Sequence, residues 1–188
     1  MAAAVTFQAI QSLFHAHKLE KCKDGTLRVK EKDKKATLQS INIDSVGASA
    51  FFIQYDDCKF PGDWFFAPHA PLHRACDAIA FCEVDGDPFI MCIELKSTEP
   101  DRTEVAQQLR SAHCFLDYLT SILETYFKCD SIRNWPRRYF VFHNQGATPL
   151  FKGTSRVDYN NTSPESALFI STHTNARILM RKLLGKSV

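Results

Sequence analysis

The sequence predicts a single α/β domain in which helices flank a mixed central β-sheet. Three observations favour this fold class. The chain has 188 residues, the length of one domain. Hydrophobic residues make up 45% of it and charged residues 23%, so there is enough apolar material for one full core. Stretches with helical and with strand-like patterns follow one another in the order helix, strands, helix, strand, strand, helix.

The first part of the chain predicts one helix and two strands. Apolar residues spaced for one helix face predict a helix over 5–20. Residues 21–36 are polar and lysine-rich around a Lys-Asp-Gly turn signal, which predicts a loop or a short solvated hairpin. Strand-like stretches follow at 38–46 and 49–55. The prolines and aspartates of residues 56–72 then predict an ordered loop.

The middle of the chain predicts a hairpin and a long helix. The β-rich runs 75–84 and 88–97 are joined by Asp85-Gly86-Asp87, a strong signal for a tight turn. Apolar residues then recur three and four positions apart over 103–127. This spacing predicts an amphipathic helix that packs against the sheet.

The last part of the chain predicts two further strands, at 139–142 and 167–171, and a closing helix over 175–184 with Asn175 as its N-cap. His143 and Asn144, at the end of the first of these strands, are expected to have a structural role. We therefore expect residues 1–188 to form one domain. Its core spans about 48–145, and a C-terminal strand and helix occupy 166–184.

Composition excludes several classes of protein. No apolar run approaches the ~18–20 residues that cross a bilayer. The N-terminus lacks the basic and apolar regions of a signal peptide. The seven cysteines are odd in number and none has CxxC spacing, which argues against a disulfide framework or a zinc ribbon. We expect a reduced, cytoplasmic protein with no membrane partner.

Two acidic residues and a lysine come together in the predicted hairpin. Glu94 and Lys96 end its second strand and, being two residues apart, point to the same face. Asp77 lies near the start of the first strand, so antiparallel pairing can bring it alongside them. Two carboxylates with open coordination positions suit a hard cation such as Mg²⁺. A lysine beside a metal-bound water can orient it or help to remove its proton.

The acidic-x-Lys pattern occurs three times, and its context separates the three. Asp33-Lys34-Lys35 has no strand before it. Asp57-Cys58-Lys59 follows a strand but runs into an irregular Phe-Pro-Gly stretch. Glu94-Leu95-Lys96 ends an apolar, central-type strand and runs through a polar loop into the long helix. Charged residues at the end of a buried strand indicate a function more strongly than surface charges do.

This arrangement resembles the PD-(D/E)xK nuclease superfamily. The matching segments are Cys76-Asp77-Ala78-Ile79, Ile93-Glu94-Leu95-Lys96-Ser97 and Gln107-Gln108-Leu109, with Cys76 where that superfamily usually has proline. A glutamine about a dozen residues past the lysine is similar to the RecB-like branch. The resemblance covers about residues 70–145 and implies a restriction-endonuclease-like αβββαβ core.

The resemblance also implies an active site and its cofactor. Asp77, Glu94 and Lys96 would be catalytic, and Asp77, Glu94 and Leu95 would hold Mg²⁺ or Mn²⁺. Gln108 would support the site from the helix. Glu20, at the end of the first helix, and His73, upstream of Asp77, are further candidate metal ligands.

We expect a metal-dependent nuclease that hydrolyses nucleic acid, with DNA favoured over RNA by analogy. A homodimer, or a partner protein that supplies specificity in a restriction, phage-defence or repair system, would fit such a small chain. One alternative is a catalytically inactive module of the same fold that binds nucleic acid or protein. Another is a phosphodiesterase or nucleotidase for small molecules, which a closed pocket would favour over an open groove.

The formal net charge of +2 conceals an uneven distribution. Residues 77–104 contain eight acids against two bases, a net charge of −6. Residues 18–35 contain eight bases against four acids, a net charge of +4, and 128–138 and 175–188 are also basic. An acidic centre between basic segments suits a metal site in a phosphate-binding groove. The alternative is that the basic segments are solvated surfaces that point in different directions.

Overall fold

Strand β6 (Asp87–Lys96) crosses the middle of the molecule, because its residues can be buried on both sides. Every side chain from Phe89 to Leu95 is buried. Strand β5 (Ala78–Val84) pairs with it in antiparallel fashion. The two strands are joined at Asp85 and Gly86, which both have a positive φ, as a two-residue hairpin turn requires. The predicted hairpin is confirmed.

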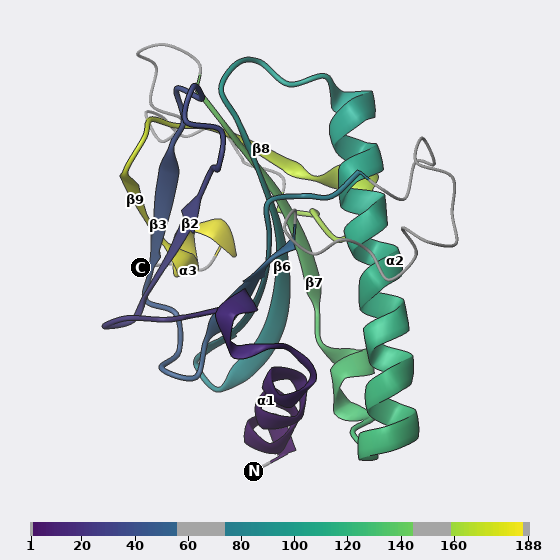
Figure 1. Cartoon of the computed structure of the whole chain (residues 1–188). Helices are drawn as coiled ribbons and strands as arrows, with labels where there is room; N and C mark the ends of the chain where they lie inside the picture. Colours follow the sequence, from purple (N-terminus) through teal and green to yellow (C-terminus); the bar gives the residue numbers. More distant parts are fainter. Residues whose placement is uncertain (1, 56–73, 145–158, 186–188) are drawn as a thin grey trace.

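The computed structural model describes residues 2–55, 74–144 and 159–185. In these residues β6 belongs to a six-stranded sheet with the order β1-β4-β5-β6-β7-β8 (Figure 1). The other members are β1 (Leu19–Lys21), β4 (Phe51–Gln54), β7 (Arg137–His143) and β8 (Leu168–Ser171). Pairing is antiparallel from β1 to β6 and parallel from β6 to β8. The expected mixed sheet is therefore confirmed, and β6 and β7 end at the same edge of it.

Two helices cover one face of this sheet, α1 (Ala2–Leu13) and α2 (Arg102–Phe127). Helix α2 begins after Asp101, whose carboxylate accepts hydrogen bonds from the N–H groups of Thr103 and Glu104. The buried residues of α2 pack with those of β4, β5 and β6 in one hydrophobic cluster. Among the described residues, no helix has both the length and the apolar character needed to cross a membrane.

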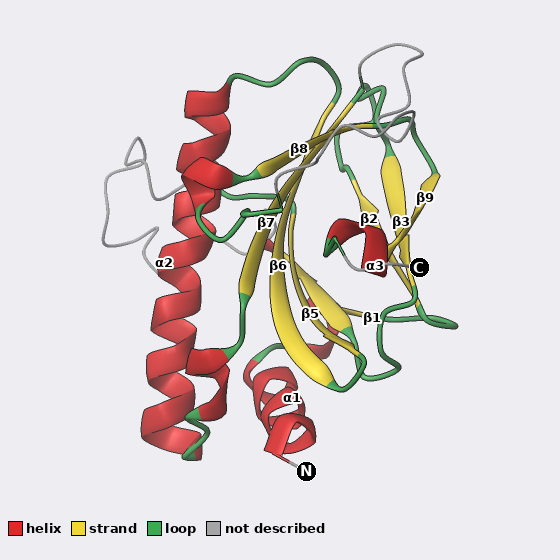
Figure 2. Cartoon of the chain, turned by 180° about the vertical axis from the view of Figure 1, so that it is seen from behind, coloured by secondary structure: helices red, strands yellow, loops and turns green. Residues whose placement is uncertain are grey.

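A second, smaller sheet covers the opposite face (Figure 2). It consists of β2 (Thr26–Lys30), β3 (Ser40–Asp44) and β9 (Ala176–Leu179), followed by the short helix α3 (Met180–Leu183). Its alternating buried residues pack in one cluster with the other face of β4, β5 and β6. The central sheet is thus the middle of three layers.

Two predicted helices are wrong in extent. The helix over 5–20 ends at Leu13, and the chain continues through a 3₁₀ turn (Ala16–Lys18) into β1, which pairs with β4. The helix over 175–184 is strand β9 followed by four helical residues. Asn175 has a φ of 60° and is a turn residue rather than an N-cap. In both places the pairing energy of a sheet edge outweighs a short helical pattern.

The segment 21–36, predicted as a loop or a short solvated hairpin, contains a turn and a strand. The Lys-Asp-Gly signal does form a tight turn, in which Asp24 and Gly25 have positive φ. Strand β2 follows it and pairs with β3. The predicted loop over 56–72 lies outside the described residues.

Candidate active site

Asp77 lies immediately before strand β5, and the register of the hairpin places it beside Glu94 of β6. Residues two apart on a strand share a face, and Ile79 and Cys92 face the helices. Asp77 and Glu94 therefore point to the helix-covered face, where they are 7% and 3% exposed. The structure brings these two predicted residues together in a buried setting.

Hydrogen bonds between the two strands hold both carboxylates in place. The N–H of Asp77 donates to Oε2 of Glu94 at 3.2 Å. The N–H of Leu95 donates to Oδ2 of Asp77 at 2.6 Å. Each carboxylate is thus anchored by the main chain of the neighbouring strand, which fixes its position without a second layer of side chains.

Lys96 completes the predicted group. Its Nζ lies 2.8 Å from Oε1 of Glu94 and 3.8 Å from Oε1 of Glu104 in α2. Burial raises the pKa of Glu94 from 4.5 to about 7, although the ammonium of Lys96 acts in the opposite direction. Partial burial lowers the pKa of Lys96, but the surrounding carboxylates outweigh it and bring this pKa above its ordinary value. The site is therefore an ion pair whose acid is poorly solvated.

Gln108 of α2 covers the site on the side of Ala75. Its Nε2 donates to the main-chain oxygen of Ala75 at 3.3 Å. Its Oε1 is buried and has no hydrogen-bond partner among the described residues. An unpaired buried amide oxygen is rare in proteins, so this atom is available to a ligand, a metal-bound water or an ion.

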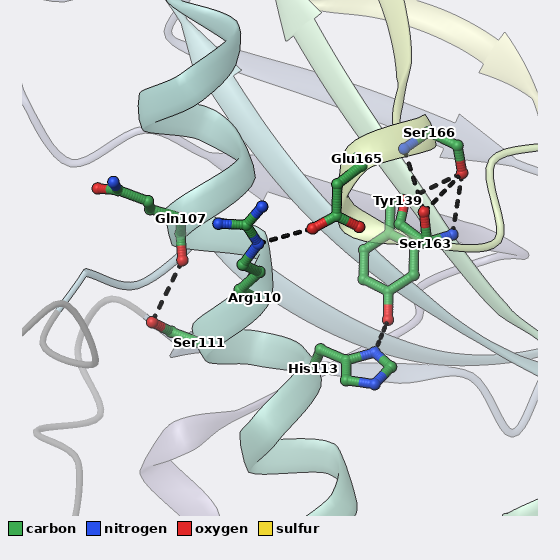
Figure 3. A network of polar contacts seen from close by, with 8 residues as sticks. All are labelled: Gln107, Arg110, Ser111, His113, Tyr139, Ser163, Glu165 and Ser166. Atoms are coloured by element: carbon green, nitrogen blue, oxygen red, sulfur yellow. Dashed lines mark hydrogen bonds and ion pairs between the residues drawn. The ribbon is translucent and has the colours of Figure 1, made fainter.

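Polar contacts further along α2 hold the helix over the sheet (Figure 3). Nε of Arg110 lies 2.6 Å from Oε1 of Glu165, in a short 3₁₀ helix (Pro164–Ser166). Nδ1 of His113 lies 2.6 Å from the hydroxyl of Tyr139 in β7. These contacts fix the helix that carries Glu104 and Gln108 to the site.

The predicted metal ligands offer oxygen atoms only. The side chain of Leu95 is apolar and 2% exposed, so only its main-chain oxygen could serve as a ligand. Together with the carboxylates of Asp77 and Glu94 it makes a hard donor set, which fits Mg²⁺ or Mn²⁺ and does not suit a soft metal. The described part of the chain has no group of three or more His, Cys, Asp or Glu side chains placed to hold a metal.

The two further candidate ligands are not brought to this site. Glu20 is exposed in β1 and pairs with Phe52, which faces the second sheet. Because paired residues share a face, Glu20 lies on the opposite side of the central sheet from Asp77. His73 lies outside the described residues.

Two residues near Lys96 were not assigned to the site by sequence. Glu104 is the third residue of α2 and its side chain approaches Lys96. It lies four residues before Gln108, and this spacing could have predicted that both side chains lie on the same face of the helix. His143 ends β7 and is the register partner of Lys96. The pairing of Lys96 with His143 depends on β7 lying next to β6 in the sheet, and no local sequence pattern predicts that strand order.

Two cavities, of about 660 and 490 Å³, lie where β7 begins, and Trp135, Pro136 and Arg138 line both. Neither is lined by Asp77, Glu94 or Lys96. They lie far from the carboxylates in the fold, because those carboxylates are at the other end of the same strands. These cavities therefore do not support a small-molecule pocket at the candidate site.

Comparison of the chain with models of protein families, with curated proteins and with solved structures gave no match.

Proposed function

We propose that this chain is a nuclease that uses Mg²⁺ or Mn²⁺ to hydrolyse phosphodiester bonds, with DNA as the favoured substrate. One observation carries the proposal. Asp77 and Glu94 are buried side by side, Glu94 accepts a hydrogen bond from the N–H of Asp77 and Asp77 from the N–H of Leu95, and Lys96 contacts Glu94. Buried acids at a strand end are costly to stability and are usually kept for chemistry.

The order of the elements supports membership of the PD-(D/E)xK superfamily. With the intervening strands β1, β2 and β3 set aside, the elements α1, β4, β5, β6, α2 and β7 follow the αβββαβ order that the resemblance implies, and β4, β5 and β6 are antiparallel while β7 is parallel to β6. We include in the proposal the cytoplasmic location, a homodimer or a specificity-supplying partner protein, and a role in restriction, phage defence or repair.

In this proposal the side chains have separate roles. Asp77, Glu94 and the main-chain oxygen of Leu95 would hold the cation, and Oε1 of Gln108 would accept a hydrogen bond from a bound water. A bound divalent cation supplies a water of lowered pKa and neutralises charge on the phosphate. Lys96, which contacts Oε1 of Glu94, would donate hydrogen bonds to the attacking water or to a phosphate oxygen.

A second candidate is a binding module of the same fold without catalysis. Its support is that the carboxylates are already engaged: Glu94 pairs with Lys96, and the described residues include no three-ligand metal group. If the ion pair between Glu94 and Lys96 stays formed, these residues serve to bind a ligand and not to hold a catalytic metal.

The test is cleavage of linear, circular and single-stranded DNA and of RNA in Mg²⁺, Mn²⁺ or EDTA. We expect cleavage that needs the metal and falls roughly 10²–10⁴-fold in D77N and K96A. The matched control is E83Q, since Glu83 lies near the far end of β5, the strand that Asp77 precedes. Metal-dependent cleavage that survives in D77N and K96A would show that the site is elsewhere. Salt-sensitive binding with no cleavage of any substrate would favour the binding module.

A further inference from the structure

His143 lies beside Lys96 in the central sheet and has no part in the site described above. The two residues are partners in the parallel register of β6 and β7. Lys96 shares a face with Cys92, and His143 with Val141, and both of these pack under the helices. His143 therefore points to the same face as Lys96, on the side away from Asp77.

The imidazole of His143 is buried and unsatisfied. The residue is 7% exposed, and its Nδ1 is buried without a hydrogen-bond partner among the described residues. Three buried side-chain polar atoms of the described part of the chain lack a partner, and His143 Nδ1 is one of them. A buried polar group that is left unpaired destabilises the fold, so packing alone does not explain an imidazole at this position.

Arg102, the first residue of α2, supplies a cation next to this imidazole. Its guanidinium carbon is 4.3 Å from the ring centroid of Phe169 in β8. Phe169 is two residues before Ser171, the register partner of His143. Within the described residues Arg102 makes no ion pair, so its hydrogen-bond donors remain available to an anion.

Burial lowers the pKa of His143, and the charge of Arg102 adds to this, while Glu99 in the preceding loop acts against it. The ring is therefore neutral at pH 7. A bare buried nitrogen costs less than a buried N–H without an acceptor, so we expect Nδ1 to be bare and Nε2 to carry the hydrogen. His143 then presents a neutral N–H donor beside the Arg102 cation.

We propose that His143 and Arg102 bind a phosphate of the nucleic-acid backbone, the one next to the scissile phosphate on the side of β7 and β8. This inference rests on the proposed function. Lys96 faces the scissile phosphate, and the next position along the same sheet edge is occupied by His143. A neutral N–H and a forked guanidinium are suitable donors for the oxygens of a phosphodiester.

Binding of fluorescein-labelled single-stranded and duplex DNA in Ca²⁺, measured by anisotropy, tests the inference. We expect H143A to bind about tenfold more weakly, as for one hydrogen bond to a charged acceptor, and H143Q to recover part of the loss. We expect R102A to lower the slope of log Kd against log salt by about one. The control is R133A, which removes an exposed arginine that pairs with Glu124, far from the site.

A neutral methylphosphonate, placed at each backbone position in turn, identifies the phosphate. Wild-type protein should lose affinity when the phosphate next to the cleaved one is neutral, and H143A should show no such loss. An equal loss in both proteins would overturn the inference. This comparison also holds if H143A is less stable, because each protein is its own reference. H143Q keeps an N–H donor and should show part of the loss of affinity that the wild-type protein shows.

The outcomes separate this inference from the proposed function. Wild-type cleavage together with unchanged binding by H143A and R102A would overturn the inference alone. Binding without cleavage, weakened in these two variants, would overturn the nuclease and support the phosphate contact. A wild-type protein that neither binds nor cleaves would overturn both.

Discussion

Glu94 is the residue at which stability and chemistry conflict. It is 3% exposed, at the end of a strand whose other central side chains are apolar. Burial raises its pKa to about 7, so near neutral pH the folded protein holds a proton that the unfolded chain has already released. Folding stability therefore falls as the pH rises from about 4.5 to about 7. Lys96 limits this loss, because its ammonium favours the ionised carboxylate.

We predict that K96M loses stability in a pH-dependent way. At pH 5 Glu94 is protonated in the folded protein, so Lys96 has no carboxylate charge to neutralise and its loss should cost less than about 1 kcal/mol. At pH 8 the variant must either bury an unpaired carboxylate or keep it protonated. We then expect a loss of roughly 1–3 kcal/mol, because Lys96 is only partly buried. Urea unfolding at the two pH values measures the difference.

The matched control for K96M is K21M, since Lys21 is an exposed lysine at the end of β1. Its free energy of unfolding should stay within about 0.5 kcal/mol of wild type at both pH values. A loss in K96M that is the same at pH 5 and pH 8 would mean that Lys96 acts through packing and not through the charge of Glu94.

At the scale of the elements, the site depends on where α2 begins. Asp101 accepts hydrogen bonds from the N–H groups of Thr103, at 2.7 Å, and Glu104, at 3.3 Å. The first turn of this helix carries Arg102 and Glu104 to the carboxyl end of β6. The cap therefore places charged residues as well as satisfying two backbone donors.

We predict that D101A lowers the free energy of unfolding by about 1 kcal/mol, the usual cost of losing an N-cap side chain. Thermal or urea denaturation provides the measurement. D130A is the control, because Asp130 precedes a 3₁₀ helix (Ser131–Asn134) but its side chain makes no capping hydrogen bond. If both variants lose the same stability, the capping explanation is wrong.

The elements that could be predicted from sequence are those whose signal is long or locally complete. Apolar residues recur with helical spacing along the 26 residues of α2. Asp85 and Gly86 are residue types that readily adopt the positive φ of a tight turn. Strand β9 could not be predicted. Its Ala176 and Ile178 fit a helix or a strand equally well, and the parallel pairing with Ile41 and Ile43 of β3 decides the outcome.

The same distinction applies to the site. Asp77, Glu94 and Lys96 could be placed together because one hairpin carries all three. Gln108 could be added because the helix follows directly. Glu20 was misplaced because its predicted helix is strand β1, with the residue on the other face of the sheet. Pairs that depend on strand order have no sequence signal of this kind.

At the scale of the whole molecule, the three basic segments lie in different places. The segment over 30–37, which includes the end of the basic segment 18–35, reaches the candidate site: the N–H of Thr37 donates to Oγ of Ser97 at 2.8 Å, one residue after Lys96. Glu31 of the same segment is close enough to raise the pKa of Glu94. By contrast, Arg177 pairs with Asp44 and Arg181 with Asp85, on the far layer.

The basic segment around the start of β7 lies at the amino end of that strand, away from the site. Arg133 pairs with Glu124, and Arg137 pairs with Asp117 of α2. These side chains are engaged within the protein at the opposite edge of the sheet from Lys96. Of the basic segments of the described chain, the one that contains Lys32, Lys34 and Lys35 is therefore best placed to meet a substrate.

We predict that the triple variant K32Q/K34Q/K35Q binds DNA more weakly and with a lower salt dependence. The three lysines are exposed, so each should contribute a phosphate contact through counterion release, and the slope of log Kd against log salt should fall by about one per lysine. The matched control is R177Q/R181Q/K182Q, which removes the same charge from the far layer.

Anisotropy titrations of labelled DNA at several salt concentrations in Ca²⁺ measure both slopes. The control should keep the wild-type slope, because net charge alone acts weakly beyond a Debye length of about 8 Å at physiological salt. If the two triple variants lose affinity equally, binding follows overall charge, and the segment over 30–37 does not flank the path of the nucleic acid. A loss confined to the first variant places that path across the edge of the sheet where Glu94 and Lys96 lie.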